Sequence, residues 1–204
     1  MMKMWCMVSL LWFCIGGLEG MKLTAAEEGD NQVVVRGGIF YPGMTITQDM
    51  YGTSLSTQVA LSSFFTKRTR LHLGVHLQRA TGSPYQKPST FENDDAAQLY
   101  VLGLATHIDY AIVQHVLRRL YLGLGLVFIK GREQIDFIPA AEAEGLGVLA
   151  SFSPEWSLSP KLFLQMNIQF RILNIRFGSD LDIYHVNHSG THLLLGLGYH
   201  FNKE

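Results

Sequence analysis

Charged side chains set among small polar residues are the first candidates for chemistry in this sequence. Arg36, Asp109, Glu155 and Arg171 each lie on the polar side of a segment in which apolar and polar residues alternate. If these sides face a narrow interior, each charge needs an opposite partner, because an isolated buried charge is costly. We therefore expect the four to form one lumenal polar network. Such a network either fixes the packing of the interior or lines a path for ions or solutes.

The eight histidines raise the question of a metal site. His72 and His76 share one face of an extended segment, but they are roughly 13 Å apart at ~3.3 Å per residue, too far to bind one ion. His185, His188 and His192 lie close together in IYHVNHSGTH and could meet around a metal if that segment folds back. Histidines bonded to neighbouring polar groups are more common than metal ligands, so we predict neither a metal site nor a cofactor.

The elements that carry these residues are predicted from hydrophobic periodicity. In residues 191–201, THLLLGLGYHF, apolar side chains such as Leu193 and Leu195 alternate with His192, Gly196 and His200. A period of two is typical of a β-strand with two different faces. Similar segments occupy residues 32–41, 51–65, 71–78, 98–112, 119–130, 144–156 and 161–173. The sequence therefore predicts an all-β protein with eight strands.

The composition of the two faces indicates which one is exposed. A soluble ligand-binding barrel would turn its apolar faces inward and show charged residues to water. Here the polar faces are rich in Gly, Ser, Ala, His, Gln and Asn, with few Lys or Glu. Small uncharged side chains suit a narrow packed lumen, so we expect the apolar faces to meet lipid. A strand can cross lipid only in a closed sheet, because every backbone polar group must be paired.

The N-terminus has the features of a signal peptide. Lys3 precedes an apolar stretch at residues 5–18, and Ala25 and Ala26 offer a cleavage site, with Gly20 as an alternative. We predict a signal peptide over residues 1–26 and one domain over residues 27–204. Both cysteines, Cys6 and Cys14, lie in the removable segment. The mature chain would therefore hold no disulfide, cysteine zinc site or cysteine nucleophile.

Composition narrows the class of protein further. Hydrophobic residues make up 48% of the 204 residues and charged residues only 16%. Beyond the N-terminus, no apolar run approaches the ~20 residues that a transmembrane helix needs. The formal net charge is −1, and no basic patch supports binding to nucleic acid. The sequence thus favours a membrane protein that crosses lipid with strands.

Four segments resemble a known family, the small outer-membrane β-barrel proteins of Gram-negative bacteria, of OmpX-like, OmpW-like and OmpA-barrel type. They are VVVRGGIFYPG, RRLYLGLGLVF, LSPKLFLQMNIQFRI and LLLGLGYHF. The resemblance implies an eight-stranded up-and-down antiparallel transmembrane β-barrel in the bacterial outer membrane. One difference is the C-terminus, since such proteins usually end on an aromatic residue, whereas Asn202, Lys203 and Glu204 follow Phe201 here.

A few barrels of this family are lipid A deacylases or acyltransferases, so an enzyme is one alternative. The deacylases carry a His-x-Ser-Asn arrangement in which the histidine activates the serine. The nearest segment here, residues 185–190, has the sequence HVNHSG and lacks that order. We therefore predict no catalytic residues and no enzymatic activity.

Eight strands enclose an interior that side chains can fill, which argues against a wide pore. We expect a structural or surface-interaction role in the cell envelope, through long connections at residues 81–96, 131–143 and 174–190. The expected partners are outer-membrane lipid and an extracellular ligand or host surface, and we expect a monomer. The alternative is a porin-like narrow transporter for small or hydrophobic solutes. In that case a ligand enters at the outer rim and leaves sideways toward lipid.

Overall fold

The computed structural model describes residues 29–43, 49–84, 97–115, 118–135, 140–178 and 183–201. The predicted signal peptide at residues 1–26 lies outside these ranges and stays a prediction. Within the described ranges, no helix is long and apolar enough to cross a membrane.

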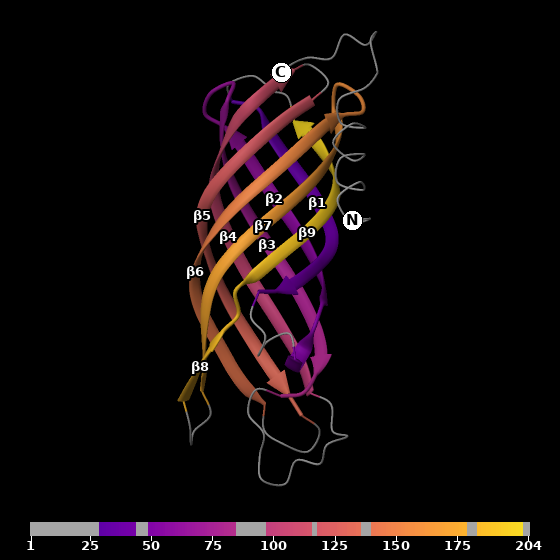
Figure 1. Cartoon of the computed structure of the whole chain (residues 1–204). Helices are drawn as coiled ribbons and strands as arrows, with labels where there is room; N and C mark the ends of the chain where they lie inside the picture. Colours follow the sequence, from indigo (N-terminus) through magenta and orange to yellow (C-terminus); the bar gives the residue numbers. More distant parts are fainter. Residues whose placement is uncertain are drawn as a thin grey trace, which may run out of the picture.

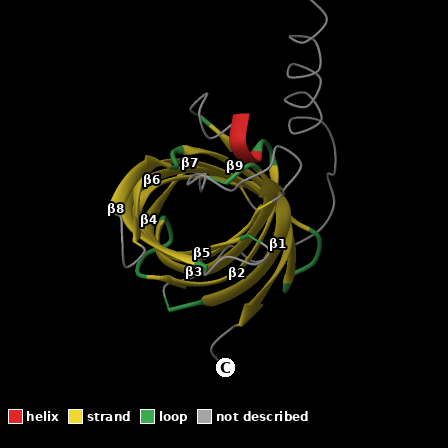
Figure 2. Cartoon of the chain, turned by 90° about the horizontal axis from the view of Figure 1, so that it is seen from below, coloured by secondary structure: helices red, strands yellow, loops and turns green. Residues whose placement is uncertain are grey.

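The described chain is a succession of antiparallel strands. They are β1 (Asn31–Pro42), β2 (Ser54–Phe64), β3 (Thr69–Gly82), β4 (Ala97–His115), β5 (Arg118–Gln134), β6 (Ala141–Ser157), β7 (Leu162–Gly178), β8 (Ile183–Asn187) and β9 (Gly190–Phe201). Each strand from β1 to β7 pairs with the next, β9 pairs with β1, and β7 pairs with both β6 and β9. The sheet therefore closes into the barrel seen end-on in Figure 2.

The last wall strand is made of two pieces. β8 pairs with the end of β7, from Asn174 to Gly178, and β9 pairs with the rest of the same strand. Because β8 and β9 share one side of β7, the nine segments form eight wall positions (Figure 1). The predicted eight-stranded up-and-down barrel is confirmed. The expected long loop at residues 174–190 is wrong, because β7 and β8 pair within it.

The strands are staggered around the barrel. The stagger is measured by following cross-strand partners once around the barrel. The path starts at Gly178 on β7 and passes through Arg132, Arg79 and Ile39. It returns to β7 at Ile168, ten residues from where it began. For ~3.3 Å per residue and ~4.8 Å between strands, this stagger tilts the strands by roughly 40° from the barrel axis. Side chains that lie far apart in sequence therefore meet at one level of the lumen.

Two ends of the barrel differ in their connections. The turns at residues 65–68 and 158–161 are short and lie at the same end as Gly29 and Phe201. Short turns face the periplasm in outer-membrane barrels, so this end is the inner rim and the opposite end is the outer rim. The chain at the outer rim includes a helical turn at residues 49–51. The second strand consequently begins at Ser54, whereas the sequence predicted a strand from Tyr51.

The outer face of the wall is apolar, as predicted. On β5, Leu122, Leu124 and Leu126 are exposed, with Leu124 at 74%. On β4, Tyr100 and Tyr110 both point outward and enclose a mainly apolar row between them. Ten residues at ~3.3 Å and a tilt of ~40° place these rings roughly 25 Å apart along the axis, the height of a lipid-facing band flanked by aromatic residues.

Candidate functional site

The interior of the barrel holds the four charged residues that were predicted from the sequence. They come from the inward positions of neighbouring strands, since every second residue of a strand points to the same face. The structure places Arg36 on β1, Asp109 on β4, Glu155 on β6 and Arg171 on β7 inside the barrel, each with at most 4% of its surface exposed. The four predicted residues are therefore all lumenal. Their partners differ from the expected ones.

Arg70 of β3 is the centre of an ion-paired network in the inner half of the lumen. Its Nε donates to Asp109 Oδ2 at 2.9 Å, and one terminal nitrogen donates to Glu155 Oε2 at 3.0 Å. The Arg119 guanidinium of β5 lies 3.5 Å from the other Glu155 oxygen. Both carboxylates and both guanidinium groups are almost fully buried. Because opposite charges meet there, the network offsets the large cost of removing them from water.

Neutral groups complete this network. Gln32 of β1 accepts a hydrogen bond from Arg70 at 2.7 Å and donates to Glu155 at 3.4 Å. The Arg70 guanidinium also lies 3.7 Å from the centre of the Tyr121 ring, on the side of the inner rim. A guanidinium over an aromatic face gains electrostatic attraction. The network thus spans the lumen between β1, β3, β4, β5 and β6.

Arg36 and Arg171 bond to neutral groups instead of carboxylates. Arg36 donates to Gln165 and to Gln58, the latter at 2.7 Å. Arg171 lies 2.8 Å from His76 Nε2 and donates to Gln169 at 2.6 Å. Within the described ranges, neither arginine is within ion-pair distance of a carboxylate. The expectation that these two arginines pair with Asp109 and Glu155 is therefore wrong.

Arg70 and Arg119 are the residues that the sequence analysis missed. Arg70 follows the short turn at residues 65–68 and Arg119 is the second residue of β5, and the predicted strands began at residues 71 and 119. The alternation did indicate their positions, because residues two apart in a strand point to the same face. Arg70 is two residues from His72, and Arg119 is two residues from Tyr121. Extending the predicted strand at residues 71–78 to the turn would have placed Arg70 inside, and the predicted strand at residues 119–130 already had Arg119 at an inward position.

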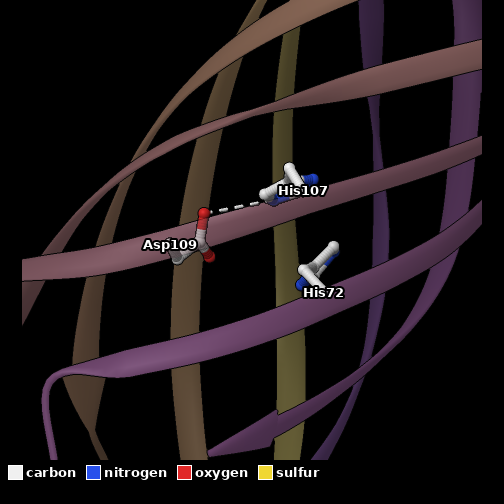
Figure 3. A group of neighbouring side chains, drawn as sticks. All are labelled: His72, His107 and Asp109. Carbon is white, nitrogen blue, oxygen red and sulfur yellow. Dashed lines mark ion pairs between the residues drawn. The ribbon is translucent and has the colours of Figure 1, made fainter. Parts of the chain in front are cut away.

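Among the described residues, His72, His107 and Asp109 each offer one possible metal-ligating atom, and these three atoms lie within 4.8 Å of one another (Figure 3). The arrangement does not fit a cation. His72 lies 3.2 Å from an Arg36 nitrogen, and Asp109 is already paired with Arg70. The two imidazole rings also lie over each other at a tilt, with centroids 4.3 Å apart and planes at 31°, so their nitrogen lone pairs do not point at one shared position. Positive charge and ring orientation both oppose a metal ion here.

His185, His188 and His192, which the sequence analysis considered as metal ligands, do not meet around one point. His188 and His192 pack against the Phe40 ring at 4.9 and 4.6 Å, and His185 is exposed. The Ser189 hydroxyl accepts a hydrogen bond from the Leu173 backbone at 2.9 Å. Ser189 therefore joins the two pieces of the wall, β8 and β9, to β7.

The outer half of the lumen has an apolar side and a polar side, and buried serine, glutamine and histidine residues make up the polar side. A cluster of fifteen buried residues fills it on the side of β4 to β7, with Leu99, Ile129 and Phe177 among its largest members. Tyr51, from the helical turn at the outer rim, belongs to this cluster and donates its hydroxyl hydrogen to Glu133. The interior thus has an ion-paired network in its inner half and an apolar cluster on one side of its outer half.

Low exposure of the inner wall shows how this interior is filled. A water-filled channel would leave the inward side chains accessible, yet Arg70, Asp109, Asn167 and Gln169 are each 0% exposed. Side chains therefore occupy the lumen at the level of the network. This packing is expected of an eight-stranded barrel, whose interior is just wide enough for them.

Several solved structures have the same architecture. The outer membrane protein OprG from Pseudomonas aeruginosa is 10% identical, with a TM-score of 0.69 over 89% of this chain and 100% of that chain. The chain has the fold of small outer-membrane β-barrel proteins. The outer membrane protein AlkL (9% identical, TM-score 0.54) is matched over 93% of this chain and 98% of that chain. The attachment invasion locus protein Ail of Yersinia pestis (11% identical, TM-score 0.53) is matched over 85% and 99%.

No protein-family model matches the sequence, and no curated protein matches it at a significant level. The likeness to the solved structures therefore concerns the fold. Together with the apolar outer belt, this fold locates the protein in a bacterial outer membrane.

Proposed function

We propose that the protein is a non-enzymatic, non-conducting outer-membrane barrel with a structural or surface-interaction role. The supporting observation is the buried network of Arg70, Asp109, Glu155 and Arg119, which occupies the lumen at its inner half. A hydrated ion would have to displace paired charges that are held between four strands. The protein therefore acts through its outer wall and outer rim instead of a through-going pore.

Planar bilayers provide the first test of this proposal. The unmodified protein is expected to show little or no steady single-channel conductance at neutral pH. As a positive control, Arg70→Ser with Glu155→Ser removes two charged side chains and creates space, so brief ion-conducting openings are expected. Stable openings of the unmodified protein would contradict the packed-lumen proposal.

The surface-interaction role is tested separately from conductance. Replacing residues 85–95 by a Gly-Ser linker of equal length alters an outer-rim connection while leaving β3 and β4 in place. Cells that produce this variant are expected to lose adhesion to host cells, whereas changing Lys67 to Gln at the inner rim is the control. Unchanged adhesion, together with unchanged antibiotic permeability of the envelope, would contradict this role.

The second candidate function is transport of small hydrophobic solutes. It is favoured by the apolar cluster in the outer half of the lumen, which would suit an apolar solute that enters at the outer rim and leaves sideways toward lipid. Leu99→Ser and Ile129→Ser make this cluster more polar without changing any residue of the Arg70 network. Transport predicts slower uptake of an apolar fluorescent dye by these variants, while a structural role predicts unchanged uptake.

A further inference from the structure

An apolar groove of about 450 Å³ lies on the lipid-facing wall over β2, β3, β4 and β5. These four strands are consecutive neighbours in the sheet (Figure 1). Leu77 and Leu102 lie on its apolar side, and Tyr100 lies toward the outer rim. Arg79, Lys130 and Arg132 also line it. The groove thus combines an apolar surface, which suits contact with a lipid acyl chain, with three cationic side chains.

Strand register brings these cations together. Arg79, Tyr100 and Arg132 are direct cross-strand neighbours in one row, and Leu77, Leu102 and Lys130 form the next row toward the membrane centre. The Arg79 guanidinium lies 5.5 Å from the centre of the Tyr100 ring. The long side chain of Lys130 can extend along the wall toward the polar boundary. The register therefore places Arg79 and Arg132 on either side of Tyr100, with Lys130 one row nearer the membrane centre.

The groove carries unbalanced positive charge. No carboxylate lines it, although Glu142 and Glu144 on β6 are the cross-strand neighbours of Arg132 and Lys130. Among the residues that the structure describes, neither Lys130 nor Arg132 is within ion-pair distance of a carboxylate. The groove is therefore complementary to an anion.

Depth in the membrane determines what kind of anion can reach the groove. Tyr100 marks the outer boundary of the lipid-facing band, roughly 25 Å from Tyr110 at the inner boundary. Lipid headgroups lie at this level, and their acyl chains lie beside the leucines below it. An anion that reaches Arg79 and Arg132 there is the headgroup of a lipid.

We propose that this groove binds an outer-leaflet lipid that carries phosphate groups. Arg79, Lys130 and Arg132 hold the phosphate oxygens by charge-assisted hydrogen bonds, Tyr100 stacks beside the headgroup, and Leu77 and Leu102 contact an acyl chain. The site is independent of the lumen, so it stands whether or not the barrel conducts.

Native mass spectrometry of the full-length protein in a maltoside detergent tests the site. The probes are bis-phosphorylated lipid A and the same lipid after enzymatic removal of both phosphates. The unmodified protein is expected to retain the phosphorylated probe and to bind the dephosphorylated one at least tenfold more weakly. Arg79→Gln, Lys130→Gln and Arg132→Gln together should weaken binding of the phosphorylated probe by roughly 100-fold, at about fivefold per cation.

Two further variants separate this site from general effects of charge and folding. Lys67→Gln, Arg68→Gln and Lys161→Gln remove the same charge at the inner rim and should leave affinity unchanged. Arg79→Lys, Lys130→Arg and Arg132→Lys keep the charge and should retain most of the affinity. Folding of every variant is checked by its mobility in unheated gels. Equal affinity of both probes, equal losses at the two rims, or displacement of bound lipid by millimolar inorganic phosphate alone would overturn the proposal.

Discussion

Arg70 forms ion pairs with two carboxylates in the described interior, whereas Arg171 forms none. Arg70 holds two carboxylates from different strands and covers the Tyr121 ring, whereas Arg171 bonds to His76 and Gln169. Loss of an arginine therefore has different consequences at these two positions. At Arg70 it leaves buried negative charge without its partner, and at Arg171 it leaves neutral groups.

Replacing Arg70 with methionine is expected to lower the free energy of unfolding by ~3–5 kcal/mol, the usual cost of breaking a buried ion pair from one side. The measurement is reversible urea unfolding in lipid vesicles. Arg171→Met is the matched control and should cost clearly less, because no carboxylate loses its partner there. Equal losses of unfolding free energy for the two variants would show that the ion pairs of Arg70 do not stabilise the barrel more than the neutral hydrogen bonds of Arg171.

A second prediction at the residue scale concerns the two faces of the wall. Leu124 is exposed to lipid near the middle of β5, so Leu124→Arg should cost ~2–4 kcal/mol in the same assay. Asn167 points inward and donates to Ser153 at 2.6 Å, so Asn167→Ser should cost less. Similar losses for both changes would contradict the assignment of the faces.

At the scale of the strands, β4 and β5 approach each other closely at one glycine. A Cβ added to Gly125 would lie 2.5 Å from the His107 Cα, so the two backbones leave no room for a side chain. Gly37 on β1 is a contrasting position in a strand, because a Cβ there would meet nothing within 4 Å. The first glycine is needed for strand packing and the second is not.

Gly125→Ala is therefore expected to destabilise the barrel by ~1–3 kcal/mol, the typical cost of overpacking. Gly37→Ala should be neutral or slightly stabilising, because alanine restricts the unfolded chain. Unfolding midpoints in urea measure both effects. A loss at Gly37 as large as that at Gly125 would point to a general need for glycine in these strands.

For the whole molecule, closure of the sheet is the property that determines how the folded barrel resists unfolding in membranes and detergent. Strands β1 to β7 and β9 have a partner on both sides over most of their length, and exposed leucine, valine and aromatic side chains cover the outside. Such a barrel resists detergent, because unfolding must expose all of these paired backbone groups together.

The unheated protein is accordingly expected to run at a different apparent mass from the boiled protein in detergent gels, and to fractionate with outer membranes. The boiled sample of the same preparation is the control. Recovery of folded protein in the soluble fraction without detergent would contradict a transmembrane barrel.

The sequence by itself determined the strands and the direction of their side chains. Alternation with a period of two is a local property, so it correctly placed Arg36 and Asp109 inside and Leu124 outside. Tertiary structure alone decided the ion-pair partners, because the stagger of ten residues around the barrel sets which inward side chains share a level. Tertiary structure also decided that β8 pairs with β7. A segment of five residues is too short to show a clear alternation, so only its pairing with β7 identifies it as a strand.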